Sequence, residues 1–227
     1  MFLDSTFLLL IPALILSFWA QAKVSGAFER FSRVAASSRM TGAMVARRIL
    51  DQAGLQDIEV ERIGGTLSDH YDPRAKVLRL SPQVHDSNSV AALGVAAHEV
   101  GHAIQHDTGY AALGMRNLIW PVANIGSNAG PFMFIIGLFL RQGFLMDLGI
   151  VLFFAAVIFY MVTLPVEFNA SRRAMELLET GGYITREEVG PTRAVLSAAA
   201  WTYVAAALMA VSQLARLLLM RGSRRDD

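Results

Sequence analysis

The sequence predicts a mainly α-helical integral membrane protein, with about four transmembrane helices and a small α+β segment outside the bilayer. Of its 227 residues, 54% are hydrophobic, and the mean hydropathy of +0.42 is high for a soluble domain. The apolar residues gather in four blocks. Three of them reach the roughly 20 residues that a membrane-spanning helix needs, and the first is shorter but is extended by Phe2 and Leu3 beyond Asp4. Between the first two blocks, apolar and charged residues alternate as they do in half-buried strands.

The four apolar blocks are residues 7–19, 118–140, 144–166 and 197–220. The third is the clearest span, because its only charged residue is Asp147, near its start. The second contains a polar, helix-breaking run at 124–131. Such a run is tolerated at membrane depth where it lines a protein or water cavity, so a kinked span or a re-entrant turn is one interpretation. The other is that the span begins later, near Gly130, with the polar run at the membrane interface.

The first block could also be a signal peptide, because Ala20, Gln21 and Ala22 resemble a cleavage site. A signal peptide has a basic region before its apolar core, whereas this chain carries Asp4 there. Basic residues, beginning with Lys23, follow the block instead. This pattern favours a retained anchor with its N-terminus outside.

The segment between the first two blocks predicts a small sheet flanked by helices. Residues 41–53 have the pattern of an amphipathic helix closed by Gly54. Residues 58–63 and 76–80 alternate apolar and charged side chains and predict two strands. Between them, residues 66–73 predict a third short strand and a turn.

A helix from about residue 88 to 107 carries the run His98-Glu99-Val100-Gly101-His102. On a helix, positions i and i+4 lie on one face, about 40° apart and roughly 6 Å along the axis. His98 and His102 can therefore bind one zinc ion, and Glu99 can take a proton from a water on the metal. The pattern predicts metal-assisted hydrolysis of an amide.

The same five letters can also occur by chance in an ordinary helix. The residues before them, 89–97, are small and apolar, which indicates a helix buried on several sides. Unpaired polar side chains in such a helix would cost roughly a few kcal/mol each. A bound divalent cation would remove that cost, so the surroundings favour the metal site.

Two histidines leave a catalytic zinc ion one protein ligand short of the usual three. The chain has no cysteine and five histidines, and none follows His106. The third ligand must therefore be a carboxylate. Glu167, directly after the third apolar block, is the strongest candidate, whereas Glu176 and Glu179 have the pattern of solvated helix residues.

Three groups of motifs carry a family resemblance: HEVGHAIQH at 98–106, LSDHYDP with LRLS at 67–81, and PVEFNASRRA at 165–174. Together they resemble the YugP-type neutral zinc metallopeptidases, membrane proteases related to the gluzincins, over nearly the whole chain. The resemblance implies zinc as the cofactor, His98, His102 and Glu167 as its ligands, and Glu99 as the general base.

One position departs from the wider gluzincin pattern, in which the second ligand helix carries Glu-x-x-Ala-Asp. Here Ser171 replaces the acid. If that acid orients a ligand histidine, the contact is either missing here or supplied from elsewhere. We interpret the replacement as a difference between subfamilies.

The group that stabilises the oxyanion is not identified by the sequence. His70, Tyr71 and Arg172 can each donate a hydrogen bond to developing negative charge. We assign His70 as a catalytic residue beside the general base, although it could equally be a turn residue. The substrate is expected to lie extended along the sheet edge near Gly65, Ser68 and Tyr71, by strand addition.

Counting spans places both large non-membrane segments, 21–112 and 167–196, on one side of the membrane. The basic residues of these segments put the active site in the cytoplasm, at the cell (inner) membrane, although the C-terminal arginines argue the other way. The predicted organisation is transmembrane helix 1 (1–20), a catalytic segment (21–112), transmembrane helices 2 and 3 (113–166), a third-ligand segment (167–196), and transmembrane helix 4 with a basic tail (197–227).

The predicted function is therefore a membrane-embedded zinc endopeptidase acting on a peptide or membrane-protein substrate. The alternatives are a non-enzymatic metal-binding scaffold or adaptor, and a metal transporter. Glu99 argues against both, because a structural or transport site has no use for a general base. The net charge of +1 gives no indication of nucleic-acid binding, and a membrane partner or an oligomer stays open.

Overall fold

A computed structural model describes residues 5–223 of the chain. The first four residues of the predicted first helix lie outside the described residues, as do Arg224 and Arg225 of the basic tail. The chain divides into two compact units. The apolar unit consists of Ala111–Pro165 and the described parts of Met1–Ala20 and Thr202–Asp227, and the mixed unit consists of Gln21–Tyr110 and Val166–Trp201.

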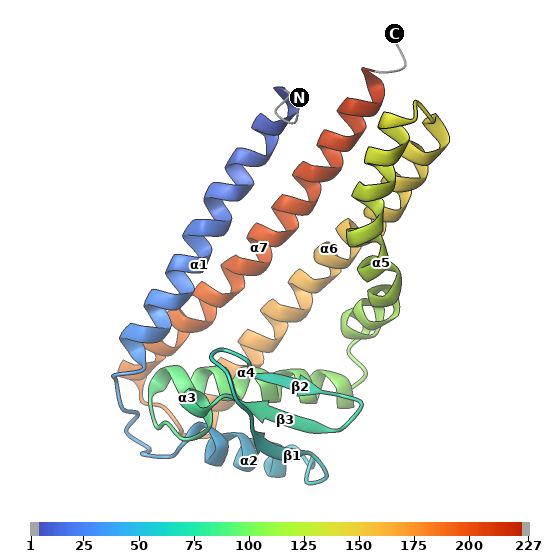
Figure 1. Cartoon of the computed structure of the whole chain (residues 1–227). Coiled ribbons are helices and arrows are strands. Elements are labelled where there is room, and N and C mark those ends of the chain that lie inside the picture. The colour runs from blue at the N-terminus through green and yellow to red at the C-terminus, as the bar shows by residue number, and fades with distance from the viewer. Residues whose placement is uncertain (1–4, 224–227) are drawn as a thin grey trace. The chain divides into compact units, whose positions relative to one another are not determined.

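Within the described residues, four helical segments are long and apolar enough to cross a membrane. They confirm the predicted membrane fold class. Figure 1 shows their order in the chain. They are Ser5–Phe31, made of the 3-10 helix Ser5–Leu10 and α1 (Ile11–Phe31), α5 (Ala111–Phe139), α6 (Gly143–Thr180) and α7 (Arg186–Gly222).

The polar run at 124–131 lies inside α5 as continuous helix. Its side chains bond along the helix, as when Asn128 Nδ2 donates to Asn124 O at 2.8 Å. A re-entrant turn is therefore wrong. A span that begins near Gly130, with the polar run at the membrane interface, stays a prediction. A kinked span also agrees with one helix that contains two internal prolines.

Glycines bring α5 and α6 close together within the apolar unit. A Cβ atom on Gly130 would lie 2.8 Å from Gly149 O, and one on Gly126 would overlap the carbonyl of Leu152. Small residues at such contacts are typical of membrane helices, because van der Waals packing holds those helices together. The run at 124–131 thus supplies a packing face.

The mixed unit contains a three-stranded sheet with the strand order β1-β3-β2. Strand β1 runs parallel to β3, and β2 runs antiparallel to it, so β2 is an edge strand. The predicted helix at 41–53 and all three predicted strands are confirmed. The elements are α2 (Gly42–Gln52), β1 (Glu59–Arg62), β2 (His70–Asp72), β3 (Val77–Leu80), α3 (Pro82–His85) and α4 (Val90–Asp107).

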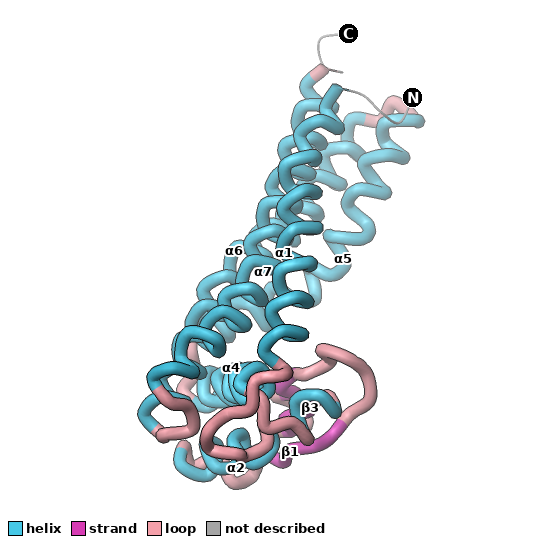
Figure 2. The backbone as a smooth tube through the Cα atoms, turned by 90° about the vertical axis from the view of Figure 1, so that its left-hand side faces the viewer, coloured by secondary structure: helices cyan, strands magenta, loops and turns pink. Residues whose placement is uncertain are grey.

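Helix α4 is the centre of the mixed unit and begins and ends as its sequence predicts. The Ser89 side chain accepts a hydrogen bond from Ala92 N at 3.1 Å, which caps the N-terminus. Gly109, with φ of +62°, follows the C-terminus. Helices α2 and α3 and strands β2 and β3 all contact α4, and the apolar residues of α4 belong to the core of this unit. Figure 2 shows α4 next to α2.

Candidate metal centre

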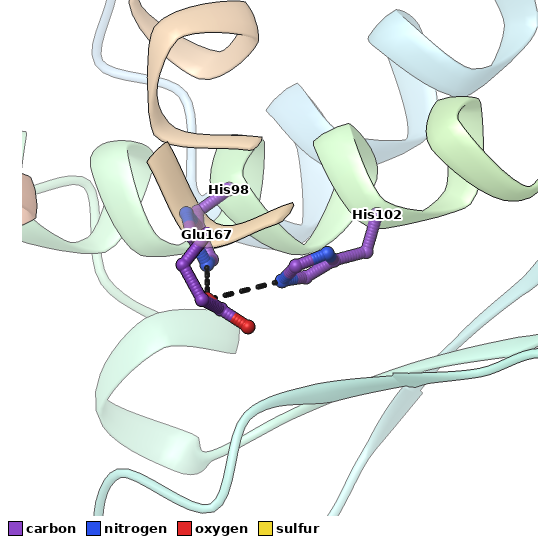
Figure 3. Close-up of side chains that lie close together, drawn as sticks. All are labelled: His98, His102 and Glu167. Atoms are coloured by element: carbon purple, nitrogen blue, oxygen red, sulfur yellow. Dashed lines mark hydrogen bonds and ion pairs between the residues drawn. The ribbon is translucent and has the colours of Figure 1, made fainter. Parts of the chain in front are cut away.

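His98, His102 and Glu167 meet in the mixed unit (Figure 3). Each offers a ligand atom, and the three atoms lie within 4.8 Å of one another. Glu167 Oε2 is 3.3 Å from His98 Nε2 and 3.5 Å from His102 Nε2. The Glu167 side chain is only 2% exposed, and a buried carboxylate needs a compensating positive charge. Two imidazole nitrogens and one carboxylate oxygen are a donor set that suits zinc.

A glycine inside the motif allows the two ligand-bearing helices to approach each other. A Cβ atom on Gly101 of α4 would lie 2.9 Å from Ala170 O and 3.3 Å from Ala170 Cα of α6. Gly101 directly precedes His102, and Ala170 lies three residues after Glu167. The small residues on both helices therefore set the distance between the ligands.

The second nitrogen of each histidine ring also has a partner. His98 Nδ1 lies 3.1 Å from Ser171 Oγ, and His102 Nδ1 lies 3.0 Å from Gln105 Oε1. A proton held on Nδ1 leaves the lone pair of Nε2 for a metal. In the wider gluzincin pattern an acid stands at position 171, and its contact with a ligand histidine was expected to be missing here or supplied from elsewhere. Ser171 itself makes this contact, with His98. The sequence analysis overlooked Gln105, although it follows His102 by three positions on the same helix.

Two carboxylates act on the charge of His102. Burial opposes a charge on the ring, but the hydrogen bond to Glu167 and the charges of Glu99 and Glu167 outweigh it and raise the pKa of His102. A metal ion competes with that proton, so metal affinity should fall as the pH falls.

Glu99 lies at the outer edge of β2. Its Oε2 accepts a hydrogen bond from Tyr71 N at 3.1 Å, and its side chain is 9% exposed. Tyr71 is paired with Leu78 of β3, but its N–H donates to Glu99, so it points toward the unpaired edge of β2 rather than toward β3. The open edge of the strand thus faces Glu99.

The three candidate oxyanion donors have different contacts in the structure. His70 is exposed and its Nδ1 lies 2.8 Å from Ser68 O, with no contact to the metal-ligand cluster among the described residues. The Tyr71 hydroxyl lies 3.0 Å from His106 Nδ1. Arg172 pairs with Glu176 on the surface of α6 at 3.5 Å. The oxyanion donor stays a prediction.

Gly65 and Ser68 lie in the turn that leads into β2. Gly65 has φ of +107°, in the region that favours glycine. Ser68 Oγ donates to Gly64 O at 3.0 Å and closes the turn. The turn is therefore built locally, and its predicted contact with substrate is a proposal.

A family model described as "putative neutral zinc metallopeptidase" matches residues 6–222. The chain belongs to this family. It is also 51% identical over 219 residues to the "Putative membrane protease YugP" of Bacillus subtilis (strain 168), which covers 96% of this chain and 97% of that protein. No solved structure is significantly similar to the chain. The resemblance to the YugP-type metallopeptidases is confirmed, and the His-His-Glu cluster is where a member of this family could hold its metal.

Proposed function

We propose that this protein is a zinc-dependent endopeptidase of the gluzincin type, embedded in the cell membrane. The observation that carries the proposal is the cluster of His98, His102 and Glu167, with Glu99 near enough for its charge to act on His102. Each ligand histidine has an oxygen partner at Nδ1, so both Nε2 atoms are available on one side. This arrangement supports a catalytic zinc site with three protein ligands.

Each residue then has a defined role in peptide-bond hydrolysis. A zinc ion, when bound, acts as a Lewis acid toward water and toward the scissile carbonyl. Glu99 takes the proton of the attacking water and returns it to the leaving amine. His98, His102 and Glu167 hold the metal. His70 is the proposed donor to the oxyanion.

The substrate is proposed to add as an extended strand to the open edge of β2. The N–H of Tyr71 points out of this edge and donates to Glu99, so a peptide that pairs there would take over this hydrogen bond and lie beside the general base. Main-chain hydrogen bonds give such binding its affinity without demanding a particular sequence. Gly65 and Ser68, in the preceding turn, would contact the same peptide.

The test of this function is hydrolysis by the purified full-length protein in detergent. An unstructured protein substrate should be cleaved, cleavage should stop on addition of a zinc chelator, and added zinc should restore it. Metal analysis should give one zinc per chain. Absence of cleavage from a protein that holds zinc would favour the scaffold or transporter alternatives.

We also propose that the metal centre faces the cytoplasm. The basic residues of 21–112 and 167–196 support this orientation. Because the chain has no cysteine, single cysteines at the exposed positions Gln56 and Thr185 can be labelled cleanly. Both should resist an impermeant thiol reagent in intact cells. Labelling of both would invert the topology, and labelling of one alone would contradict a common side.

A further inference from the structure

Gln105 is completely buried and lies three positions after His102 on α4. A buried amide has to be satisfied by hydrogen bonds, and its polar atoms have three partners. Its Oε1 lies 3.0 Å from His102 Nδ1. Its Nε2 donates to Val166 O at 2.8 Å and to Asn169 Oδ1 at 2.9 Å.

The partners on α6 determine which way this amide points. Val166 O is a carbonyl and can only accept a hydrogen bond. Asn169 Oδ1 is also an acceptor, and it is turned toward Gln105 while receiving a second hydrogen bond from Arg173 Nε at 2.9 Å. Both acceptors require the NH₂ group of Gln105, so its oxygen must face His102.

The direction of the amide fixes the state of the His102 ring. An oxygen facing Nδ1 can only accept, so the proton of a neutral His102 lies on Nδ1. The lone pair then lies on Nε2, the atom that faces Glu167. An isolated neutral imidazole can carry its proton on either nitrogen. Here the hydrogen bonds from Gln105 to α6 orient the amide and thereby select the tautomer of His102.

We infer that Gln105 is a positioning residue of the metal centre, which holds His102 in its metal-binding tautomer and anchors it to α6. The inference rests on the proposed zinc-peptidase function. The anchoring points, Val166 and Asn169, flank Glu167 in the chain. One side chain thus ties the second histidine ligand to the backbone that carries the carboxylate ligand.

The test compares zinc affinity in Gln105→Met and Thr192→Val. The first replaces the amide with an apolar chain of similar length, and the zinc dissociation constant, measured by chelator competition on the full-length protein, should rise about 10- to 100-fold. Thr192 is also completely buried, and its hydroxyl donates only to Glu188 O within its own helix, at 2.8 Å. Thr192→Val controls for the loss of a buried hydrogen bond and should leave zinc affinity unchanged.

Two further variants separate orientation from general packing. Gln105→Glu keeps an oxygen facing His102 but replaces the NH₂ group with a second oxygen, which would face the acceptors Val166 O and Asn169 Oδ1. Its zinc dissociation constant should therefore rise above that of wild type. Asn169→Ala removes one of the two acceptors on α6 that hold the Gln105 amide, and it should weaken zinc binding severalfold. Asn169 is only half-buried, so this variant tests the inference even if Gln105→Met does not fold.

Wild-type affinity in Gln105→Met, Gln105→Glu or Asn169→Ala would overturn the inference, as would equal weakening in Thr192→Val. These failures are distinct from failure of the proposed function. If wild type itself bound no zinc, the zinc-peptidase proposal would fail. If wild type bound zinc and Gln105→Met bound it equally well, only the role of Gln105 would fail.

Discussion

The two units of this protein differ in which side chains they expose and which they bury. In the apolar unit, large side chains such as Leu118, Phe139 and Phe144 are 79%, 73% and 75% exposed. Its inner contacts rely on glycine and a small cluster around Phe134. Apolar side chains that face lipid lose nothing by being outside, so such helices need close packing rather than a large core.

In the mixed unit the core is apolar and closed, yet it contains the buried polar side chains of Glu99, Gln105 and Glu167. Each of these has a hydrogen-bond or ion-pair partner. A buried polar group is tolerated only when it is paired. The comparison predicts that changes in the mixed unit alter metal binding and catalysis, whereas changes in the apolar unit alter helix packing alone.

The largest expected effect is that of Glu99→Gln in the mixed unit. The substitution keeps size and hydrogen bonding but removes the base, so the proteolytic rate should fall roughly 10²- to 10⁴-fold while zinc stays bound. The matched control is Glu176→Gln on the surface of α6, which should cleave normally. Cleavage by Glu99→Gln at the wild-type rate would contradict the hydrolase mechanism and leave the scaffold as the leading alternative.

The next effect is on metal content. Glu167→Ala removes the buried carboxylate between the two imidazoles, so zinc per chain should fall far below that of wild type in metal analysis. Glu176→Ala, on the same helix but exposed, should retain its zinc. Full zinc occupancy in Glu167→Ala would remove this residue from the site.

A smaller effect is expected at the crossing of α4 and α6. Gly101→Ala places a methyl group against the Ala170 backbone and should cost about 1–3 kcal/mol of stability, with weaker zinc binding because Glu167 is displaced. Gly190→Ala in α7 is the control, since a Cβ atom there meets nothing within 4 Å. Thermal unfolding and chelator competition measure the two effects. Unchanged zinc affinity in Gly101→Ala would show that the close approach does not set the ligand distance.

The counterpart in the apolar unit is Gly126→Ala, which presses against the Leu152 carbonyl of α6. It should also cost about 1–3 kcal/mol of stability, but the zinc dissociation constant should not change. Gly114→Ala, in the same helix with open space around it, should be neutral in both measurements. A loss of zinc affinity in Gly126→Ala would break the separation between the two units.

The smallest effect is expected at the sheet. The hydrogen bond from Arg79 lowers the pKa of Asp72 below its ordinary value of 3.8. A carboxyl with a lowered folded-state pKa contributes stability that is present above the unfolded pKa and lost as pH falls through the folded pKa. Asp72→Asn should therefore lower the unfolding temperature slightly at neutral pH and show less acid dependence than wild type. Identical pH profiles would show that this pair contributes nothing.

The sequence by itself determined the strands of the sheet, the helix of the histidine motif and the ligand set proposed for the metal. The alternation at 58–63 and 76–80 predicted β1 and β3, because strand side chains alternate between two faces. The i, i+4 spacing of His98 and His102 depends only on helix geometry, and the lack of a later histidine left a carboxylate as third ligand.

Only the tertiary structure decided how that site is supported. The sequence does not reveal which acceptors face the amide of Gln105, that Ser171 reaches His98, or that the free edge of β2 meets Glu99. These contacts join residues far apart in the chain, as with the 73 positions between Ser171 and His98. The polar run in α5 was equally undecided, because local preference predicted a break where packing against α6 keeps a helix. Local periodicity specifies elements, whereas contacts between elements depend on how they pack, and the orientation of each ligand depends on those contacts.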